Sequence, residues 1–158
     1  MTENSSTPAI CEFCELINNA AEKSVIFENE LAVVLVPRRL RTIGDLMVLP
    51  KKHVSSMIDL TCKEQHLMIK ACKIAASKIE RLFDPDGLNI AWNFGQIAGQ
   101  GIDHLSIDLI TRGTRFSTGE SVFKPVLEVE KITAAECYRI SVDHFWVAQE
   151  VTRSPPFG

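Results

Sequence analysis

The stretch that decides the fold reads LNIAWNFGQIAGQGIDHLSIDLITR and covers residues 88–112. Its first seven residues, 88–94, are mostly apolar and predict a strand, and the glycine-bearing segment 95–101 predicts a loop. Apolar residues then alternate with polar ones over 104–110, which predicts another short strand. On such a strand, positions 104, 106 and 108 face one side of the sheet.

Upstream of this stretch, short apolar runs predict three more strands and a capping pattern predicts a long helix. The strands cover 24–27, 31–36 and 46–49, with a turn at 28–30 between the first two. Thr61-Cys-Lys-Glu64 is a capping-box pattern, and the helix that it opens runs to about residue 83. Apolar residues recur along this helix at spacings of three and four, as on one buried face: Met68, Ala71, Cys72, Ala75, Ile79 and Leu82. This mixture of short strands and one long helix predicts an α+β domain.

Composition excludes several classes of protein. The 158 residues favour one domain, and 46% hydrophobic with 23% charged residues is the balance of a globular chain, not a disordered one. The net charge of −3 argues against a general nucleic-acid coat, and no apolar run approaches the roughly 18 residues of a membrane span. The N-terminus lacks the pattern of a secretory signal, and five cysteines, an odd number, argue against a disulfide framework. We therefore expect a cytoplasmic protein without a nucleic-acid or membrane partner.

The two ends of the chain are expected to lie outside the core domain. The expected parts are a flexible N-terminus at 1–10, the domain at 11–115 and a C-terminal extension at 116–158, packed on or near the domain. Within the extension, 122–129 favours an extended segment with Pro125 at a sheet edge. A second capping-box pattern favours a helix over about 134–149, although part of this segment also alternates as a strand would.

Cys11 and Cys14 form a CxxC motif, which fits one zinc ion, a redox pair or two buried thiols. A redox pair usually lies between a strand and a helix, whereas a polar tail precedes Cys11, so the motif alone leaves open a zinc site or two buried thiols. Zinc requires two further ligands, and the chain has four histidines. His66 is expected on the helix surface and His144 lies in the extension, so His53 and His104 are the candidates.

Residues 11–112 resemble the histidine triad (HIT) superfamily in its bacterial zinc-containing branch. The matching pieces are CEFC at 11–14, ENE at 28–30, Gly44 before LMVLPKKHV, LNIAWNFGQIAGQ at 88–100 and HLSIDLITR at 104–112. This resemblance implies a HIT-like fold, with an antiparallel sheet of about five strands and a long helix packed on it. It also implies one structural zinc ion per chain, held by four residues: Cys11, Cys14, His53 and His104.

The resemblance also implies that the catalytic strand is degenerate. Its three triad positions are His104, Ser106 and Asp108, so the central nucleophile of active members is a serine here. A serine hydroxyl needs a general base, and Asp108 places a negative charge where a phosphate would bind. The position of the family's ribose-binding Asp is Pro37, and Asp45 follows Gly44 where the family usually has His. The candidate ligand-binding residues are Asn93, Gly99, Gln100, Ser106 and Asp108.

Three functions fit these residues. The first is a HIT-like protein that has lost nucleotidyl hydrolase or transferase chemistry and binds a purine nucleotide or another small ligand in the remnant pocket. The second is an active nucleotide phosphohydrolase of the HIT family with altered catalytic residues. The third is a dimeric, zinc-stabilised interaction module. The resemblance implies a homodimer built around the helix near 62–83 and the strand near 88–94.

Overall fold

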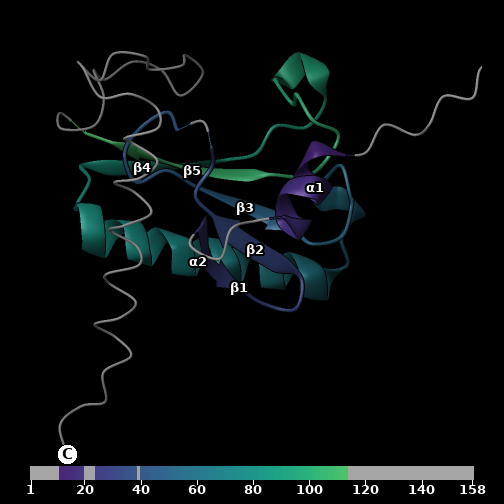
Figure 1. Ribbon diagram of the computed structural model, residues 1–158, viewed down its shortest axis with the longest axis horizontal. Helices are drawn as coiled ribbons and strands as arrows, with labels where there is room; N and C mark the ends of the chain where they lie inside the picture. The colour runs from purple at the N-terminus through teal and green to yellow at the C-terminus, as the bar shows by residue number, and fades with distance from the viewer. Residues whose placement is uncertain (1–10, 20–23, 39, 114–158) are drawn as a thin grey trace, which may run out of the picture.

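The computed structural model describes residues 11–19, 24–38 and 40–113. These residues form one five-stranded antiparallel sheet with a helix on each face (Figure 1). The expected α+β fold with a long helix on an antiparallel sheet is therefore confirmed. The elements expected in the C-terminal extension, at 122–129 and 134–149, lie outside the described residues, as do residues 1–10.

The sheet has the strand order β1-β2-β3-β5-β4, and every neighbouring pair is antiparallel. Its strands are β1 (Val25–Glu28), β2 (Ala32–Leu35), β3 (Leu46–Pro50), β4 (Gly87–Ala91) and β5 (Ile107–Arg112). The turn between β1 and β2 is held by Asn29, whose side-chain oxygen accepts hydrogen bonds from the amides of Leu31 and Ala32. Two short 3-10 helices, η2 (Met57–Asp59) and η3 (Gln96–Ala98), complete the connections.

The long helix α2 (Cys62–Phe83) covers one face of the sheet and encloses the main core. The helix buries the apolar stripe that the spacing predicted, with one difference. At its end Phe83 is buried, whereas Leu82 is only partly buried. Its partners on the sheet include Val34, Val48 and Ile107. The helix begins with the expected capping box, since Thr61 and Glu64 each bond to the other's backbone amide.

The capping box also makes stability depend on pH. Hydrogen bonds from Lys52 and from Thr61 lower the pKa of Glu64 to about 2. A carboxyl whose folded pKa is depressed stabilises the fold above its unfolded pKa, and this contribution is lost as the pH falls toward the folded value. We therefore expect Glu64→Gln to melt at a lower temperature than the original protein at pH 7. In thermal melts, the difference in melting temperature between the two proteins should disappear as the pH falls from 4.5 to about 2. A difference that stays constant over this range would contradict the assignment.

A short helix that the sequence did not predict, α1 (Glu12–Asn18), covers part of the opposite face. Three apolar residues of α1, Phe13, Leu16 and Ile17, pack on a small cluster of sheet residues. The buried members of this cluster are Val33, Leu35, Met47 and Leu49. The sheet therefore has two apolar faces, a large one under α2 and a small one under α1 (Figure 1).

Two expected strands are shorter than predicted, for one reason. The last pairs of β5 are Val48 with Ile107 on one side and Ala91 with Asp108 on the other. Beyond them, the amide of Leu105 bonds to the carbonyl of Val54, 2.6 Å away, and leaves the ladder. The strand expected from residue 104 therefore begins at Ile107, and the strand expected to reach residue 94 ends at Ala91.

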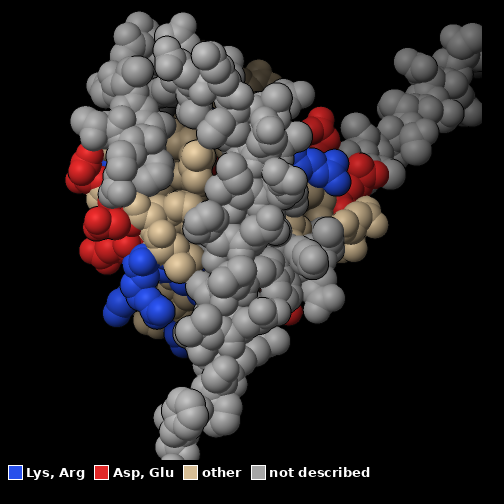
Figure 2. Space-filling view, turned by 60° about the vertical axis from the view of Figure 1, so that its left-hand side comes forward, with Lys and Arg blue, Asp and Glu red and all other residues tan. Residues whose placement is uncertain are grey.

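The surface of the described residues mixes both signs of charge. Figure 2 shows lysine and arginine side chains beside aspartate and glutamate on one face, with no single sign covering it. Within the described ranges, no helix has the length and apolar character needed to cross a membrane.

Candidate functional site

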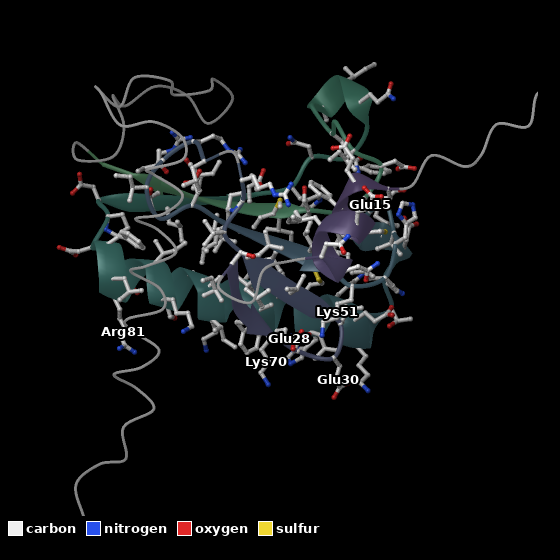
Figure 3. The ribbon with its side chains drawn as sticks, in the orientation of Figure 1. Glu15, Glu28, Glu30, Lys51, Lys70 and Arg81 are labelled. Atoms are coloured by element: carbon white, nitrogen blue, oxygen red, sulfur yellow. The ribbon has the colours of Figure 1, made fainter. Side chains whose placement is uncertain are left out.

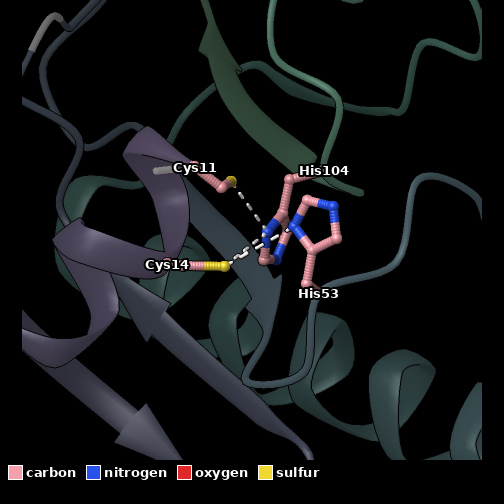
Figure 4. Close-up of side chains that lie close together, drawn as sticks. All are labelled: Cys11, Cys14, His53 and His104. Carbon is pink, nitrogen blue, oxygen red and sulfur yellow. Dashed lines mark hydrogen bonds between the residues drawn. The ribbon is translucent and has the colours of Figure 1, made fainter. Parts of the chain in front are cut away.

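The four expected zinc ligands come together in one cluster (Figure 4). Cys11 lies at the N-cap of α1 and Cys14 in its first turn, whereas His53 follows β3 and His104 precedes β5. Their ligand atoms all lie within 4.8 Å of one another. His66 is exposed on α2, as expected, and His144 lies outside the described residues.

The spacing of these atoms fits a tetrahedral zinc ion. The Sγ of Cys14 lies 3.5 Å from the Nδ1 of both histidines, and the Sγ of Cys11 lies 3.4 Å from the Nδ1 of His104. Zinc bonds of about 2.3 Å to sulfur and about 2.0 Å to nitrogen, at tetrahedral angles, separate the two ligands by about 3.5 Å. Two thiolates and two imidazoles fill all four positions, which is the pattern of a structural zinc site.

His104 is oriented for metal binding by its second ring nitrogen. The ring is completely buried, and its Nε2 lies 3.0 Å from the carbonyl oxygen of Pro50, to which it donates. This hydrogen bond leaves the Nδ1 lone pair directed at the two sulfurs. Burial is the main cause that lowers the pKa of His104, which favours the neutral imidazole that zinc requires.

A groove of about 810 Å³ lies beside the metal cluster, on the α1 face of the sheet. Its walls include Ser106 and Asp108, the expected second and third triad positions, and Pro37, the expected position of a ribose-binding Asp. The other lining residues are Glu12, Phe13, Glu15, Leu16, Asn19, Arg38, Arg41, Met47 and Ile102. His104 is therefore turned into the metal cluster, whereas Ser106 and Asp108 reach the groove.

Asp108 is paired with an arginine that the sequence analysis did not consider. One guanidinium nitrogen of Arg41, Nη2, lies 2.5 Å from the Oδ2 of Asp108. Asp108 is therefore not the isolated negative charge that the sequence predicted. No sequence signal joins the two residues, because they are 67 positions apart and meet only through the loop before β3.

Asp45 holds the loop that presents Arg41. Its buried carboxylate accepts hydrogen bonds from the amides of Arg41 and Thr42, at 2.8 and 3.1 Å, and from the Thr42 hydroxyl. The amide of Thr111 in β5 lies 3.4 Å from its other oxygen. Burial raises the pKa of Asp45 above its ordinary value, against the effect of these bonds. The residue that replaces the family's His thus ties the Arg41 loop to the strand that carries Asp108.

The other candidate ligand residues lie away from this groove. Gln100 holds its own loop, because its side chain accepts from the Gly95 amide and donates to the Ser55 carbonyl. Gly99 has φ +92°, and an added Cβ there would lie 3.3 Å from Nδ2 in the side chain of Asn93. Asn93, Gly99 and Gln100 therefore lie in one loop, and none of them lines the groove.

A second hollow, of about 420 Å³, lies on the outer side of α2 among Lys70, Lys73, Lys78 and Arg81. Lys70 and Arg81 are on the far side of the sheet from Glu15 of α1 (Figure 3). This hollow contains no triad position, and it is half the size of the groove. We therefore treat the metal cluster and the groove beside it as the functional site.

Comparison with known proteins identifies the family. The family model of the HIT domain matches residues 18–114. The chain belongs to the HIT family. An uncharacterised HIT-like protein of Borreliella burgdorferi is 30% identical over 127 residues, which cover 77% of this chain and 89% of that relative. The bis(5'-adenosyl)-triphosphatase of Dictyostelium discoideum is 31% identical over 112 residues, which cover 70% of this chain and 72% of the enzyme.

Solved HIT structures have the same fold. A zinc-bound histidine triad family protein from Mycobacterium smegmatis superimposes with a TM-score of 0.63 at 22% identity, covering 89% of this chain and 96% of that protein. The resemblance to the HIT family and the expected fold are therefore confirmed. The Cys₂His₂ cluster of this HIT protein supports the predicted zinc ion.

Proposed function

We propose that this HIT protein binds a small phosphate-bearing ligand, with a purine nucleotide as the candidate, and has lost nucleotidyl hydrolase and transferase chemistry. The observation that supports this proposal is the replacement of two triad positions by Ser106 and by an Asp108 that is engaged with Arg41. Binding groups for an anion are present in the groove, whereas an activated nucleophile is not.

Among the residues that the structure describes, none is placed to activate Ser106. A serine acts as a nucleophile when an adjacent base accepts its proton. Among the described residues, no hydrogen bond joins the Ser106 hydroxyl to Asp108 or to a histidine ring. Asp108 instead directs a carboxylate oxygen at Arg41, and His104 points at the cysteines. The zinc site offers no open position for a water molecule, since four protein ligands fill it.

The groove has the chemistry to hold a phosphate and a flat ring. Arg38 lines it and forms no ion pair with a carboxylate of the described residues, so its guanidinium is available to a phosphate. Phe13, Leu16, Met47 and Ile102 give the groove apolar walls that suit a purine. Pro37 offers no side-chain acceptor for a ribose hydroxyl, so we expect recognition through the phosphate and the base.

Binding measurements with AMP and GMP test this proposal directly. We expect micromolar binding without turnover, measured by calorimetry with product analysis of the same samples. Arg38→Ala should weaken binding by about 10- to 100-fold, because a hydrogen bond to a charged group contributes about 1.5–3 kcal/mol. Arg81→Ala, on the outer side of α2, is the matched control and should leave binding unchanged. If the protein bound neither AMP nor GMP at millimolar concentration, the proposal would be rejected. A protein-interaction module would then be the favoured function.

Catalysis is the second candidate function, because a relative over 70% of this chain is named as a bis(5'-adenosyl)-triphosphatase. In that case Ser106 is the nucleophile, and Asp108 has to leave Arg41 to act as its base. We also expect the protein to work in a reducing compartment such as the cytoplasm, where the thiols of Cys11 and Cys14 are available to zinc.

We further propose a homodimer formed through β4 and α2. β4 is at the end of the strand order, so one of its edges is unpaired within the described sheet. Ile90 of β4 is 48% exposed, although its neighbour Leu88, two residues earlier on the same face, packs against the core under α2. A second copy would cover Ile90 and extend the sheet.

Sedimentation at micromolar concentration should show this dimer. Ile90→Glu should shift the protein to a 17.6 kDa monomer, because a charge would be buried in the interface. Ile58→Glu is the control, since Ile58 is 77% exposed in η2 and lies outside β4 and α2. A monomer at all concentrations in the original protein would disprove the dimer.

A further inference from the structure

We propose that the zinc site builds one wall of the ligand groove, so that the groove is complete only in the metal-loaded protein. Zinc would then control ligand binding through the position of α1, as well as stabilise the chain. This inference rests on the contacts of α1 and does not depend on which ligand the groove takes.

The first step is that α1 has little stability of its own. It has seven residues, whereas isolated helices shorter than about 12–15 residues are marginal in water. None of its residues is fully buried, and its N-cap residue, Cys11, makes no side-chain capping hydrogen bond. Among the described residues, its apolar contacts with the sheet come from the partly buried Phe13, Leu16 and Ile17.

The second step is that α1 can leave without disrupting the main core. The cluster under α1 is separate from the core between the sheet and α2, and the two lie on opposite faces. The fifteen ladder pairs of the described sheet and the contacts of α2 all involve residues outside α1. Undocking of α1 would therefore expose Val33, Leu35 and Met47 but leave the sheet and α2 folded.

The third step is that the metal ligands join α1 to the sheet. Cys11 and Cys14 belong to the start of α1, whereas His53 and His104 belong to the segments at the ends of β3 and β5. The Pro50 carbonyl holds His104 from the sheet side, and Phe13 of α1 packs edge-on against the other side of its ring, at 5.8 Å between centroids. A metal bound by all four residues therefore attaches α1 to the segments that follow β3 and precede β5.

The last step is that α1 forms a wall of the groove. It contributes Glu12, Phe13, Glu15, Leu16 and the adjoining Asn19 to the lining. The opposite wall contains Arg41, Ser106 and Asp108, which belong to the sheet and its loop. Release of α1 would remove the first wall and leave the second in place. Ligand and zinc should accordingly bind with positive coupling, each raising the affinity for the other.

Hydrogen–deuterium exchange of the full chain tests this inference without an activity assay. The exchange of α1 (Glu12–Asn18) is compared with that of α2 (Cys62–Phe83), before and after zinc is removed with EDTA. We expect α1 to lose its protection after removal and to exchange near the rate of an unfolded segment, whereas the central amides of α2 stay protected by at least about 10³-fold. Zinc added back should restore the slow exchange of α1.

Two variants serve as a matched pair in the same measurement. Cys14→Ser removes a metal ligand and should show fast exchange of α1 even with zinc present, whereas Cys62→Ser replaces an exposed cysteine outside the cluster and should exchange like the original protein. Unchanged exchange of α1 after removal of zinc would overturn the inference. Loss of protection in α2 together with α1 would overturn it as well, because the sheet and α2 would then not stay folded without zinc. If Cys14→Ser does not fold, the comparison of α1 and α2 before and after EDTA treatment still tests the inference.

Discussion

Protein purified without added metal should contain one zinc ion per chain, and its loss should lower the melting temperature by about 10 °C. A ligand that binds only the folded state at a free concentration 1,000-fold above its Kd stabilises that state by about 4 kcal/mol. In a chain of this size, each kcal/mol changes the melting temperature by about 2–4 °C. Elemental analysis and calorimetric melts before and after treatment with EDTA measure both quantities.

Substitutions of the metal ligands should reproduce this loss. Cys14→Ser should melt near the temperature of the zinc-free protein, and Cys62→Ser near that of the zinc-loaded protein. His104→Ala should be the most damaging, because it also leaves the Pro50 carbonyl without its buried partner, at a cost of about 1–3 kcal/mol. Zinc well below one per chain, with no change of melting temperature in Cys14→Ser, would contradict the zinc assignment.

The parts of the fold that could be predicted from sequence are those fixed by local patterns. The capping box at Thr61 and Glu64 and the apolar spacing after it placed α2 correctly. The zinc ligands were found because CxxC and the two histidines fall at the intervals of a known family, and the structure brings all four together. Both predictions depend on residues whose type and spacing already define the chemistry.

The parts that could not be predicted depend on contacts between distant segments. Residues 104–106 alternate like a strand, yet they leave the ladder because His104 turns to the metal cluster and Leu105 bonds to Val54. The Arg41–Asp108 pair is likewise absent from any local pattern, since Asp45 and Thr111 hold the loop that brings Arg41 to β5. The helix α1 escaped prediction because seven residues hold too few apolar positions for a helical period.

Dinucleoside polyphosphates and nucleoside phosphoramidates should be hydrolysed at least about 10⁴-fold more slowly by this protein than by a HIT hydrolase with an intact triad. Removal of catalytic residues that act as a unit commonly costs about 10⁴–10⁶ in rate. Here the nucleophile position is Ser106, and Asp108 is held by Arg41. Chromatographic detection of AMP released from diadenosine triphosphate measures the difference.

Restoring the triad tests the reason for this loss. Ser106→His with Asp108→His should recover little activity if the groove binds the substrate poorly, and adding Pro37→Asp should raise it by supplying an acceptor for the ribose. The Asp108→His change also frees Arg41 from its ion pair, so its guanidinium becomes available to a phosphate. A gain in the triple variant alone would show that substrate binding, as well as the nucleophile, has been lost.

The opposite result would identify Ser106 as a working nucleophile. It requires turnover by the original protein at rates like those of intact HIT hydrolases, and loss of that turnover in Ser106→Ala. Asp108 would then have to accept the serine proton, which it can do only when Arg41 turns from it toward the substrate phosphate. In that mechanism Arg41→Ala would leave Asp108 free in the absence of substrate and would raise the KM more than it lowers kcat. In a binding protein, Arg41→Ala would change affinity for the nucleotide and leave no turnover to measure.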